Sequence, residues 1–251
     1  MSGHSKWSTI KRKKGALDAK RGQIFTRLAR DITMAARDGG GDPAGNVKLR
    51  LAIERARAEN MPKDNIERAI KKGTGDDKGA AAFEEILYEA YAPHGIALLI
   101  QAVTDNRNRT ISDLRHALSK NGGSMGEGGS VAWQFERKAY FSFPLGTHSE
   151  ENLFERVVDS GADDLLVDEG TVEVYGPADS FKSIVDALTD IGIEPEAAEL
   201  RYEPTQPIEL EPKQAAAVLR TIEAIEDLDD TQNVYSNLQI TDEALAELEA
   251  A

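Results

Sequence analysis

The chain has 251 residues, with 40% hydrophobic and 29% charged residues and a formal net charge of −14, a balance typical of a globular protein with room for one large domain or two to three small ones. It has no cysteine, which excludes disulfides, thiolate nucleophiles and zinc–thiolate sites and fits a reducing compartment. No apolar run approaches the roughly 20 residues of a membrane helix, and the start of the chain lacks the apolar core of a secretory signal, so we expect a cytoplasmic protein without a membrane partner.

The charge is divided unequally along the chain. Residues 1–75 hold 18 Lys and Arg against 8 Asp and Glu, a net charge of +10, whereas residues 76–251 hold 12 against 36, a net charge of −24. Such an excess of one sign in one segment is typical of a module that binds a polyanion. The sequence therefore predicts a basic nucleic-acid-binding module attached to an acidic body.

The chain opens on a cationic arm, residues 1–15, which contains the stretch HSKWSTIKRKKG. Its cations can neutralise phosphates and release counterions, and its tryptophan offers a face on which a base can stack. Lysine is a point charge, which suits phosphate contact better than bidentate reading of a base. The alternative is a solubilising tail whose tryptophan docks back onto the module. The residues of the arm expected to contact nucleic acid are Lys6, Trp7, Lys11, Arg12, Lys13 and Lys14.

Three helices are predicted after the arm. They span about residues 16–37, 46–59 and 63–72, and Gly73 is expected to end the third. In the first helix the apolar residues recur at helical spacing and the arginines project roughly opposite them, so cations are expected on the solvent faces. No helix-turn-helix pattern stands out, so sequence-specific groove reading is not required. The residues expected to form a track for a sugar–phosphate backbone are Lys20, Arg21, Arg27, Arg30, Arg68, Lys71 and Lys72.

Beyond a linker at residues 73–82 the periodicity changes to that of strands. Residues 83–92 and 95–104 are predicted to pair as strands across a turn, followed by a helix over 110–120 and a strand over 130–136. The change from a period of 3.6 to a period of two marks the start of a second domain.

The next stretch has the order strand, helix, strand, strand, helix, strand, which is that of a ferredoxin-like unit. A helix over 212–226 and a strand near Val234 then complete the earlier sheet. The predicted fold class is α+β, with a small N-terminal helical domain followed by two α/β domains, the second ferredoxin-like and inserted into the first. The predicted domains are 1–75, 80–135 together with 204–240, 136–203, and an acidic C-terminal tail at 241–251.

A second polar site is predicted in the segment TDNRNRT, residues 104–110, between a buried strand and a helix. With Thr110 as the N-cap, the helix N-terminus would favour an anion such as a phosphate of RNA. The alternative is a structural turn in which Asp105 pairs with one of the arginines. The candidate residues of this site are Asn106, Arg107, Asn108, Arg109 and Thr110.

No motif indicates catalysis or a metal site. The four histidines are scattered, without a pair at i, i+4 spacing, and neither an EF-hand nor a nucleophile signature is present. The stretch NGGSMGEGGS, residues 121–130, lacks the Lys-Ser/Thr ending of a P-loop and predicts a flexible turn. We therefore expect no enzymatic activity, no cofactor, no metal ion and no small-molecule substrate.

Three motifs closely resemble the YebC/PmpR family: MSGHSKWSTIKRKKGALDAKRGQIF at the start of the chain, NMPKDNIERAIKKG at residues 60–73, and TDNRNRT. The resemblance runs from Met1 to about Gly129, and the domain order agrees beyond it. One departure is YEAYAPHG at residues 88–95, where the family usually reads YEGYGPGG. The resemblance implies three domains, a cytoplasmic location and association with nucleic acid, and it implies no enzymatic activity.

The resemblance leaves two functions open. Members of the family include bacterial proteins described as transcriptional regulators and the mitochondrial translational activator of cytochrome oxidase. We expect a DNA-binding transcriptional regulator that uses the basic N-terminal module; the alternative is a translation factor that associates with messenger RNA or the ribosome. A third class, a small-molecule enzyme or sensor built on the ferredoxin-like unit, finds no nucleophile, metal cluster or cofactor loop in the sequence.

Overall fold

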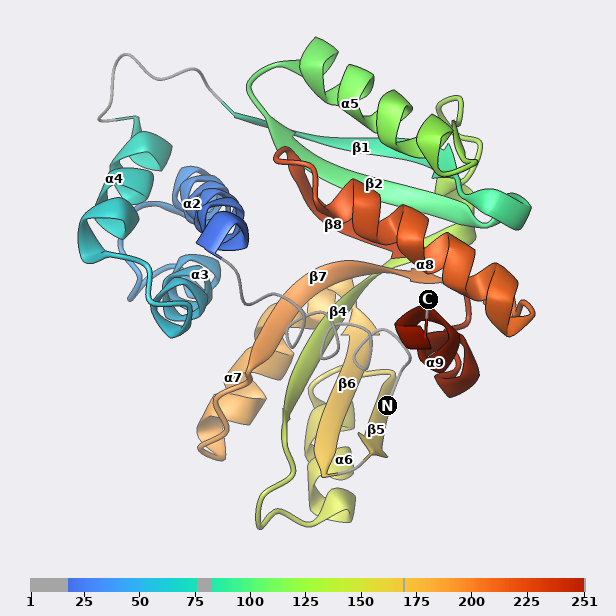
Figure 1. Cartoon of the computed structure of the whole chain (residues 1–251). Helices are drawn as coiled ribbons and strands as arrows, with labels where there is room; N and C mark the ends of the chain where they lie inside the picture. The colour runs from blue at the N-terminus through green and yellow to red at the C-terminus, as the bar shows by residue number, and fades with distance from the viewer. Residues whose placement is uncertain (1–17, 76–82, 169, 251) are drawn as a thin grey trace.

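The computed structural model describes residues 18–75, 83–168 and 170–250 of the chain. They form a helical module followed by two antiparallel sheets with helices packed on them (Figure 1). This arrangement confirms the predicted α+β class with a helical N-terminal part. The contacts expected of the cationic arm lie outside the described residues.

The N-terminal module consists of α2 (Asp18–Gly39), α3 (Val47–Ala58) and α4 (Lys63–Thr74). Asn46 caps α3 by accepting a hydrogen bond from the backbone N–H of Leu49, which satisfies one of the free amides of the first turn. The helices bury one apolar face each, including Ile32, Leu49 and Ile66. The three helices that periodicity predicts are therefore present, within a few residues of the expected bounds.

Gly73 does not end α4, contrary to the prediction. The helix runs on to Thr74, and the residue in the left-handed conformation that follows it is Gly75, with φ of 80°. A Cβ atom on Gly73 would lie 2.3 Å from the backbone oxygen of Thr33 on α2. Gly73 is therefore required for the close approach of α4 to α2.

The first sheet has the strand order β3-β1-β2-β8, with antiparallel pairing throughout. Helices α5 and α8 lie on one face of this sheet, and α9 packs beside α8 (Figure 1). The core between sheet and helices includes Leu98, Leu114 and Leu219, all fully buried. The elements are β1 (Glu84–Tyr91), β2 (Ala97–Thr104), α5 (Arg107–Lys120), β3 (Ser124–Met125), α8 (Pro212–Glu226), β8 (Thr231–Ser236) and α9 (Asp242–Ala250).

The glycine-rich segment is organised around one carboxylate. Glu89 of β1 accepts hydrogen bonds from the backbone N–H groups of Gly129, Val131 and Ala132, the last two at 2.6 and 2.9 Å. These bonds hold residues 132–134 in a 3₁₀ turn, so the strand predicted from residue 130 begins only at Phe135. Before Phe135, backbone hydrogen bonds to the Glu89 carboxylate therefore take the place of hydrogen bonds to a neighbouring strand.

The second sheet has the strand order β5-β6-β4-β7, also antiparallel. Its chain order is strand, helix, strand, strand, helix, strand, as expected of a ferredoxin-like unit. The chain enters this sheet from the first one and returns to it through α8 and β8, so the second sheet is an insertion. The elements are β4 (Phe135–Pro144), α6 (Glu150–Asp159), β5 (Asp164–Asp168), β6 (Thr171–Pro177), α7 (Phe181–Asp190) and β7 (Ala197–Pro204).

Across residues 18–75, 83–168 and 170–250, no helix combines the length and the apolar character that crossing a bilayer requires.

The close packing at Gly73 makes a testable prediction. We expect Gly73→Ala to lower the free energy of unfolding by about 1–3 kcal/mol, because its methyl group must push α2 and α4 apart. Gly22 is the matched control, since it lies in α2 with no atom within 4 Å of an added Cβ. Gly22→Ala should raise stability by about 0.5–1 kcal/mol through helix propensity. Urea denaturation measures both values, and equal effects of the two substitutions would contradict the packing role of Gly73.

Candidate nucleic-acid interface

Helix α2 joins the N-terminal module to the body of the protein. It lies between the other two helices of the module and the first sheet, whereas α4 lies on the side away from both sheets (Figure 1). The face of α2 opposite its own apolar stripe therefore meets the corner between α8 and β8. The expectation that this whole face points to solvent is wrong, because a second domain covers part of it.

Arg30 is the centre of this contact. Only 7% of Arg30 is exposed, and its guanidinium forms an ion pair with the Asp230 carboxylate at 2.9 Å. It also donates to the backbone oxygen of Asp229. The structure therefore gives Arg30, which was expected to contact a phosphate, a buried position between α2 and the start of β8.

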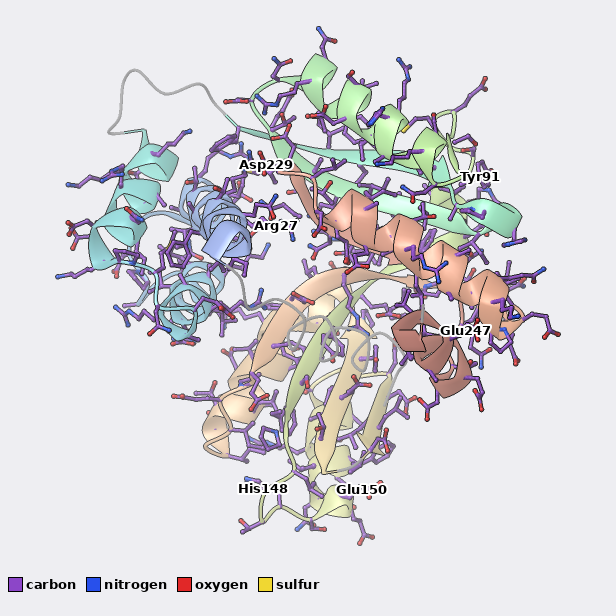
Figure 2. The ribbon with its side chains drawn as sticks, in the orientation of Figure 1. Arg27, Tyr91, His148, Glu150, Asp229 and Glu247 are labelled. Carbon is purple, nitrogen blue, oxygen red and sulfur yellow. The ribbon has the colours of Figure 1, made fainter. Side chains whose placement is uncertain are left out.

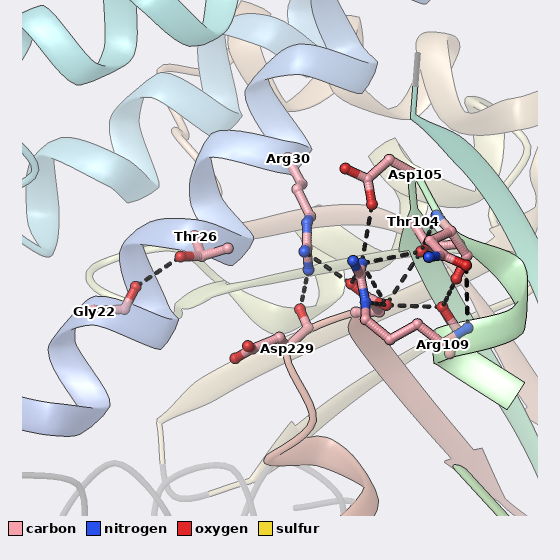
Figure 3. Close-up of polar contacts among 10 residues, drawn as sticks. Gly22, Thr26, Arg30, Thr104, Asp105, Arg109 and Asp229 are labelled. Carbon is pink, nitrogen blue, oxygen red and sulfur yellow. Dashed lines mark hydrogen bonds and ion pairs between the residues drawn. The ribbon is translucent and has the colours of Figure 1, made fainter. Parts of the chain in front are cut away.

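Asp230 accepts hydrogen bonds from both sides of the junction, where the side chains of Arg30 and Arg109 point toward one another (Figure 3). Besides Arg30, Arg109 contacts it at 2.8 Å, and the hydroxyl groups of Thr104 and Thr110 donate to it at 3.1 and 2.8 Å. The residue is 4% exposed. Burial alone would raise the pKa of Asp230, but the hydrogen bonds from Thr110 and Arg109 and the positive charge of Arg30 hold that pKa below its ordinary value. Asp230 is therefore an ionised carboxylate with a full set of donors.

The second polar site has a different arrangement from the one expected. Asn106, not Thr110, is the N-cap of α5, and it accepts from the backbone N–H of Arg109. Thr110 lies one turn inside the helix and is buried. The Asn106 side chain accepts from a free backbone N–H of the first turn, so the N-cap lies four residues before the predicted one.

The anion that lies at this helix start belongs to the protein itself. Arg109 holds Asp230 and also pairs with Asp105 at 3.0 Å, and Arg107 forms an ion pair with Glu84 of β1. Asn108 is exposed on the first turn of α5. Contact of nucleic acid with this segment stays a prediction, and a phosphate bound to Arg107 or Arg109 would compete with these carboxylates.

Arg27 lies one turn before Arg30 on the same side of α2. Figure 2 shows it on the side of α2 that faces the corner where Asp229 lies. Burial lowers the pKa of Arg27, although Glu226, Asp227 and Asp229 are near enough to raise it. Some arginines of the module therefore lie against acidic residues of the body, and their opposite charges hold the two parts together.

A second contact joins α3 to the inserted sheet. Arg55 donates to the backbone oxygen of Ala198 at 3.3 Å and pairs with Glu199 of β7 at 3.4 Å. Asp31 of α2 lies in the same junction. Burial raises the pKa of Asp31 to about 6, against the opposing effect of the positive charge of Arg55.

Two of the three cations predicted to face outward on α4 are exposed, whereas the third packs against Phe83. Arg68 and Lys71 are exposed, and Lys72 is half-buried with its ammonium group 3.7 Å from the centroid of the Phe83 ring, a cation–π contact. Five further cations of the module are exposed and are not among the expected contacts. They are Arg37, Lys48, Arg50, Arg57 and Lys63.

The expected contact residues thus fall into separate groups. Arg68, Lys71 and Lys72 share α4, whereas Arg27 and Arg30 lie in the junction with the body. Lys20 and Arg21 lie in the first turn of α2, with side chains outside the described part of the structure. Lys6, Trp7, Lys11, Arg12, Lys13 and Lys14 also lie outside it.

Sequence reasoning missed Asp230 and Phe83. Asp230 is one of three acidic residues in the stretch DLDD, and nothing in that composition separates the buried one from the others. Phe83 was expected only as the first residue of a strand, but it lies next to β1 and beneath Lys72. Among the described residues, no three or more His, Cys, Asp or Glu side chains come together in a group that could hold a metal ion.

Comparison with known proteins connects this geometry to a family. The profile described as "TACO1/YebC protein N-terminal domain" matches residues 5–76, and the profile described as "TACO1/YebC second and third domain" matches residues 83–238. The chain is 51% identical to a protein of Geotalea uraniireducens over 98% of each chain, and 51% identical to one of Chlorobium chlorochromatii over 99% of each. Both relatives are named "Probable transcriptional regulatory protein".

A solved structure has the same fold. The crystal structure of a conserved hypothetical protein from Aquifex aeolicus superposes with a TM-score of 0.79, at 41% sequence identity, covering 90% of this chain and 93% of that one. The likeness therefore extends over the helical module and both sheets.

The Asp230 network predicts a loss of stability when its charge is removed. We expect Asp230→Asn to lower the free energy of unfolding by about 3 kcal/mol, because Arg30 stays buried without its counterion. Asp229→Asn is the control, since the Asp229 side chain is exposed and should change stability by less than about 0.5 kcal/mol. Chemical denaturation gives both values, and a loss for Asp230→Asn no larger than the control value would show that the pair does not hold the junction.

The raised pKa of Asp31 predicts that removing its charge stabilises the protein at high pH. The pKa of Asp31 is about 6 in the folded protein, above its ordinary value of 3.8. The folded state therefore favours the protonated carboxyl, and stability falls as the pH rises through 6 and the buried carboxyl ionises. Asp31→Asn should therefore raise the free energy of unfolding at about pH 8, by about 1–3 kcal/mol, and change it little at about pH 4. Asp38→Asn, on an exposed turn of the same helix, should show no such difference. A destabilising effect of Asp31→Asn at pH 8 would contradict the prediction.

Proposed function

Because this chain belongs to the TACO1/YebC family, we propose that it is a regulatory protein that binds nucleic acid through its N-terminal module. Its specific role in this proposal is that of a DNA-binding transcriptional regulator, in agreement with the names of its bacterial relatives. The contact includes the cationic arm, with Lys6, Trp7, Lys11, Arg12, Lys13 and Lys14, the start of α2 with Lys20 and Arg21, and the outer face of α4.

The observation that carries the proposal is the division of cations within the module. Arg27, Arg30 and Arg55 lie against acidic residues of the body. Arg68 and Lys71 of α4 are exposed, and Arg68 also lines the cleft beside Phe83. Since residues 76–251 have a net charge of −24 from their 12 basic and 36 acidic residues, they repel a polyanion and restrict contact to the exposed cations of the module.

An RNA-associated role in translation is the second candidate. The contacts that we propose are made by lysines and arginines on one helix face and an arm, and such contacts neutralise phosphates of either polymer. A translation factor on the ribosome or on messenger RNA would use the same surface, and the acidic body would then face basic protein partners. Crosslinking in cells, followed by sequencing of the bound nucleic acid, separates the two candidates: promoter fragments support the first and ribosomal or messenger RNA the second.

The proposal includes no catalytic step, cofactor or small-molecule substrate. It places the protein in the cytoplasm, where a bacterial regulator meets both DNA and ribosomes and where a chain without cysteine needs no oxidising environment.

The proposed interface predicts a change in the salt dependence of binding. We expect the double substitution Arg68→Ala and Lys71→Ala to weaken duplex DNA binding and to reduce the slope of log K against log salt by about 2, since each phosphate contact contributes about 0.9. Deletion of residues 1–14 should reduce the slope further. Binding is measured by fluorescence anisotropy over a range of salt concentrations.

Lys182→Ala is the matched control for this experiment. Lys182 is an exposed lysine on α7 of the inserted domain, paired with Asp186, and its removal should leave affinity and slope unchanged. Equal slopes for the wild type, the double variant and the truncated protein would refute binding through the N-terminal module.

A further inference from the structure

A cleft of about 560 Å³ lies between the N-terminal module and the first sheet. One side is formed by α2 and α4, and the other by Phe83, the start of α5 and the residues before β8. The buried Arg30 is one of its lining residues, and its volume falls in the range of small-ligand sites in proteins. The cleft is therefore large enough for one nucleotide.

The walls of the cleft suit a flat aromatic group. Phe25 of α2, Met61 before α4 and Phe83 supply apolar surface, and Ala29 and Ala69 leave room between the helices. Apolar and aromatic surface of this kind packs against any nucleobase, because each has a π-face. The Phe83 ring also carries the Lys72 ammonium group at 3.7 Å and the Arg30 guanidinium at 5.5 Å from its centroid.

Two cations of α4 also line the cleft. Arg68 is exposed, and Lys72 follows it at i+4 with its ammonium group over the Phe83 ring. Residues at this spacing lie on one helix face, about 6 Å apart along the axis. They can contact the phosphates on either side of a base that enters the cleft.

The acidic residues of the cleft decide which part of a nucleotide enters it. Asp229 lines it beside Asp105 and the buried Asp230, and a phosphate that approached the Asp229 carboxylate would be repelled. Asp105 and Asp230 are engaged by Arg109, whereas the Asp229 carboxylate forms no hydrogen bond or ion pair with another residue in the described part of the chain. A carboxylate accepts hydrogen bonds from the amino group of a base, as in recognition of cytosine N4.

We propose that this cleft receives one unpaired nucleobase that carries an exocyclic amino group, while Arg68 and Lys72 contact the flanking phosphates. The inference rests on the proposed function and adds a ligand class to it: adenine, cytosine or guanine from a single-stranded segment, in preference to uracil or thymine. An RNA loop and an opened DNA strand both supply such a base, and the chemistry of recognition is the same.

The test compares short labelled strands of one base, oligo(A) and oligo(U) as RNA and oligo(dA) and oligo(dT) as DNA, with a fully paired duplex, on the full chain. We expect adenine strands to bind about tenfold more tightly than uracil or thymine strands. Thr26→Phe fills the cleft from an exposed position on α2. It should weaken binding of adenine strands about tenfold, the size of one lost stacking contact, and leave duplex binding unchanged.

Two further variants complete the design. Ala44→Phe adds the same ring on an exposed loop of the module away from the cleft and should bind all strands as the wild type does. Asp229→Asn replaces the proposed acceptor by a group that also donates, and should abolish the preference for adenine over uracil without preventing folding.

The outcomes separate the cleft from the proposed function. A preference for adenine that Thr26→Phe and Asp229→Asn remove supports the proposal, and the polymer bound more tightly identifies the source of the base. If adenine and uracil strands bind equally, or if Thr26→Phe binds adenine strands as tightly as the wild type, the nucleobase proposal is overturned. The proposed function still stands in that case, because the module still binds nucleic acid. Failure of the wild type to bind any of these nucleic acids overturns the proposed function as well.

Discussion

The arrangement of this protein depends on one buried carboxylate. Asp230 lies at the start of β8 and is held by Arg30 from the N-terminal module and by Arg109 from the second domain. Thr104 and Thr110 supply its remaining donors. An unpaired charge at such a buried site is costly. Helix α2, the segment from β2 to α5 and the residues before β8 must therefore keep their relative positions. This fixes α2 against the body, while Arg68 and Lys71 of α4 stay exposed.

The same constraint gives the basic residues two different tasks. Cations on the inner side of the module, such as Arg30 and Arg55, neutralise acidic residues of the two sheets. Cations on the outer side, such as Arg68 and Lys71, are exposed. The acidic body attracts the first group and repels nucleic acid from its own surface, so opposite charge both joins the domains and limits where a polyanion can bind. The cleft between module and body lies where these two groups of cations meet.

Much of this organisation follows from sequence patterns, and the exceptions have identifiable causes. Helical and strand periods predict α2 to α4, the β1–β2 hairpin and the inserted ferredoxin-like order, because each element buries a face against its nearest neighbours. Arg30 shows the limit of this reasoning: periodicity places it opposite the apolar stripe of its own helix, but a residue 200 positions away covers that face. The sequence likewise predicts Thr110 as the N-cap of α5, but in the structure Asn106 is the N-cap and accepts a hydrogen bond from the backbone N–H of Arg109. The surface track of cations is only partly predictable for the same reason. The sequence does not show that Arg30 is buried and Arg68 exposed, nor that Asp230 is buried and Asp229 exposed.

The division of cations into an inner, structural group and an outer, binding group is tested most directly by one comparison. The measurement is the salt dependence of nucleic-acid binding for Arg30→Gln beside Arg68→Gln, with folding of each variant verified by its unfolding transition. Arg68→Gln should reduce the slope of log K against log salt by about 0.9 while stability is retained, whereas Arg30→Gln should keep the wild-type slope and lower stability. An equal loss of slope for both variants would contradict the division and place Arg30 among the residues that contact phosphate.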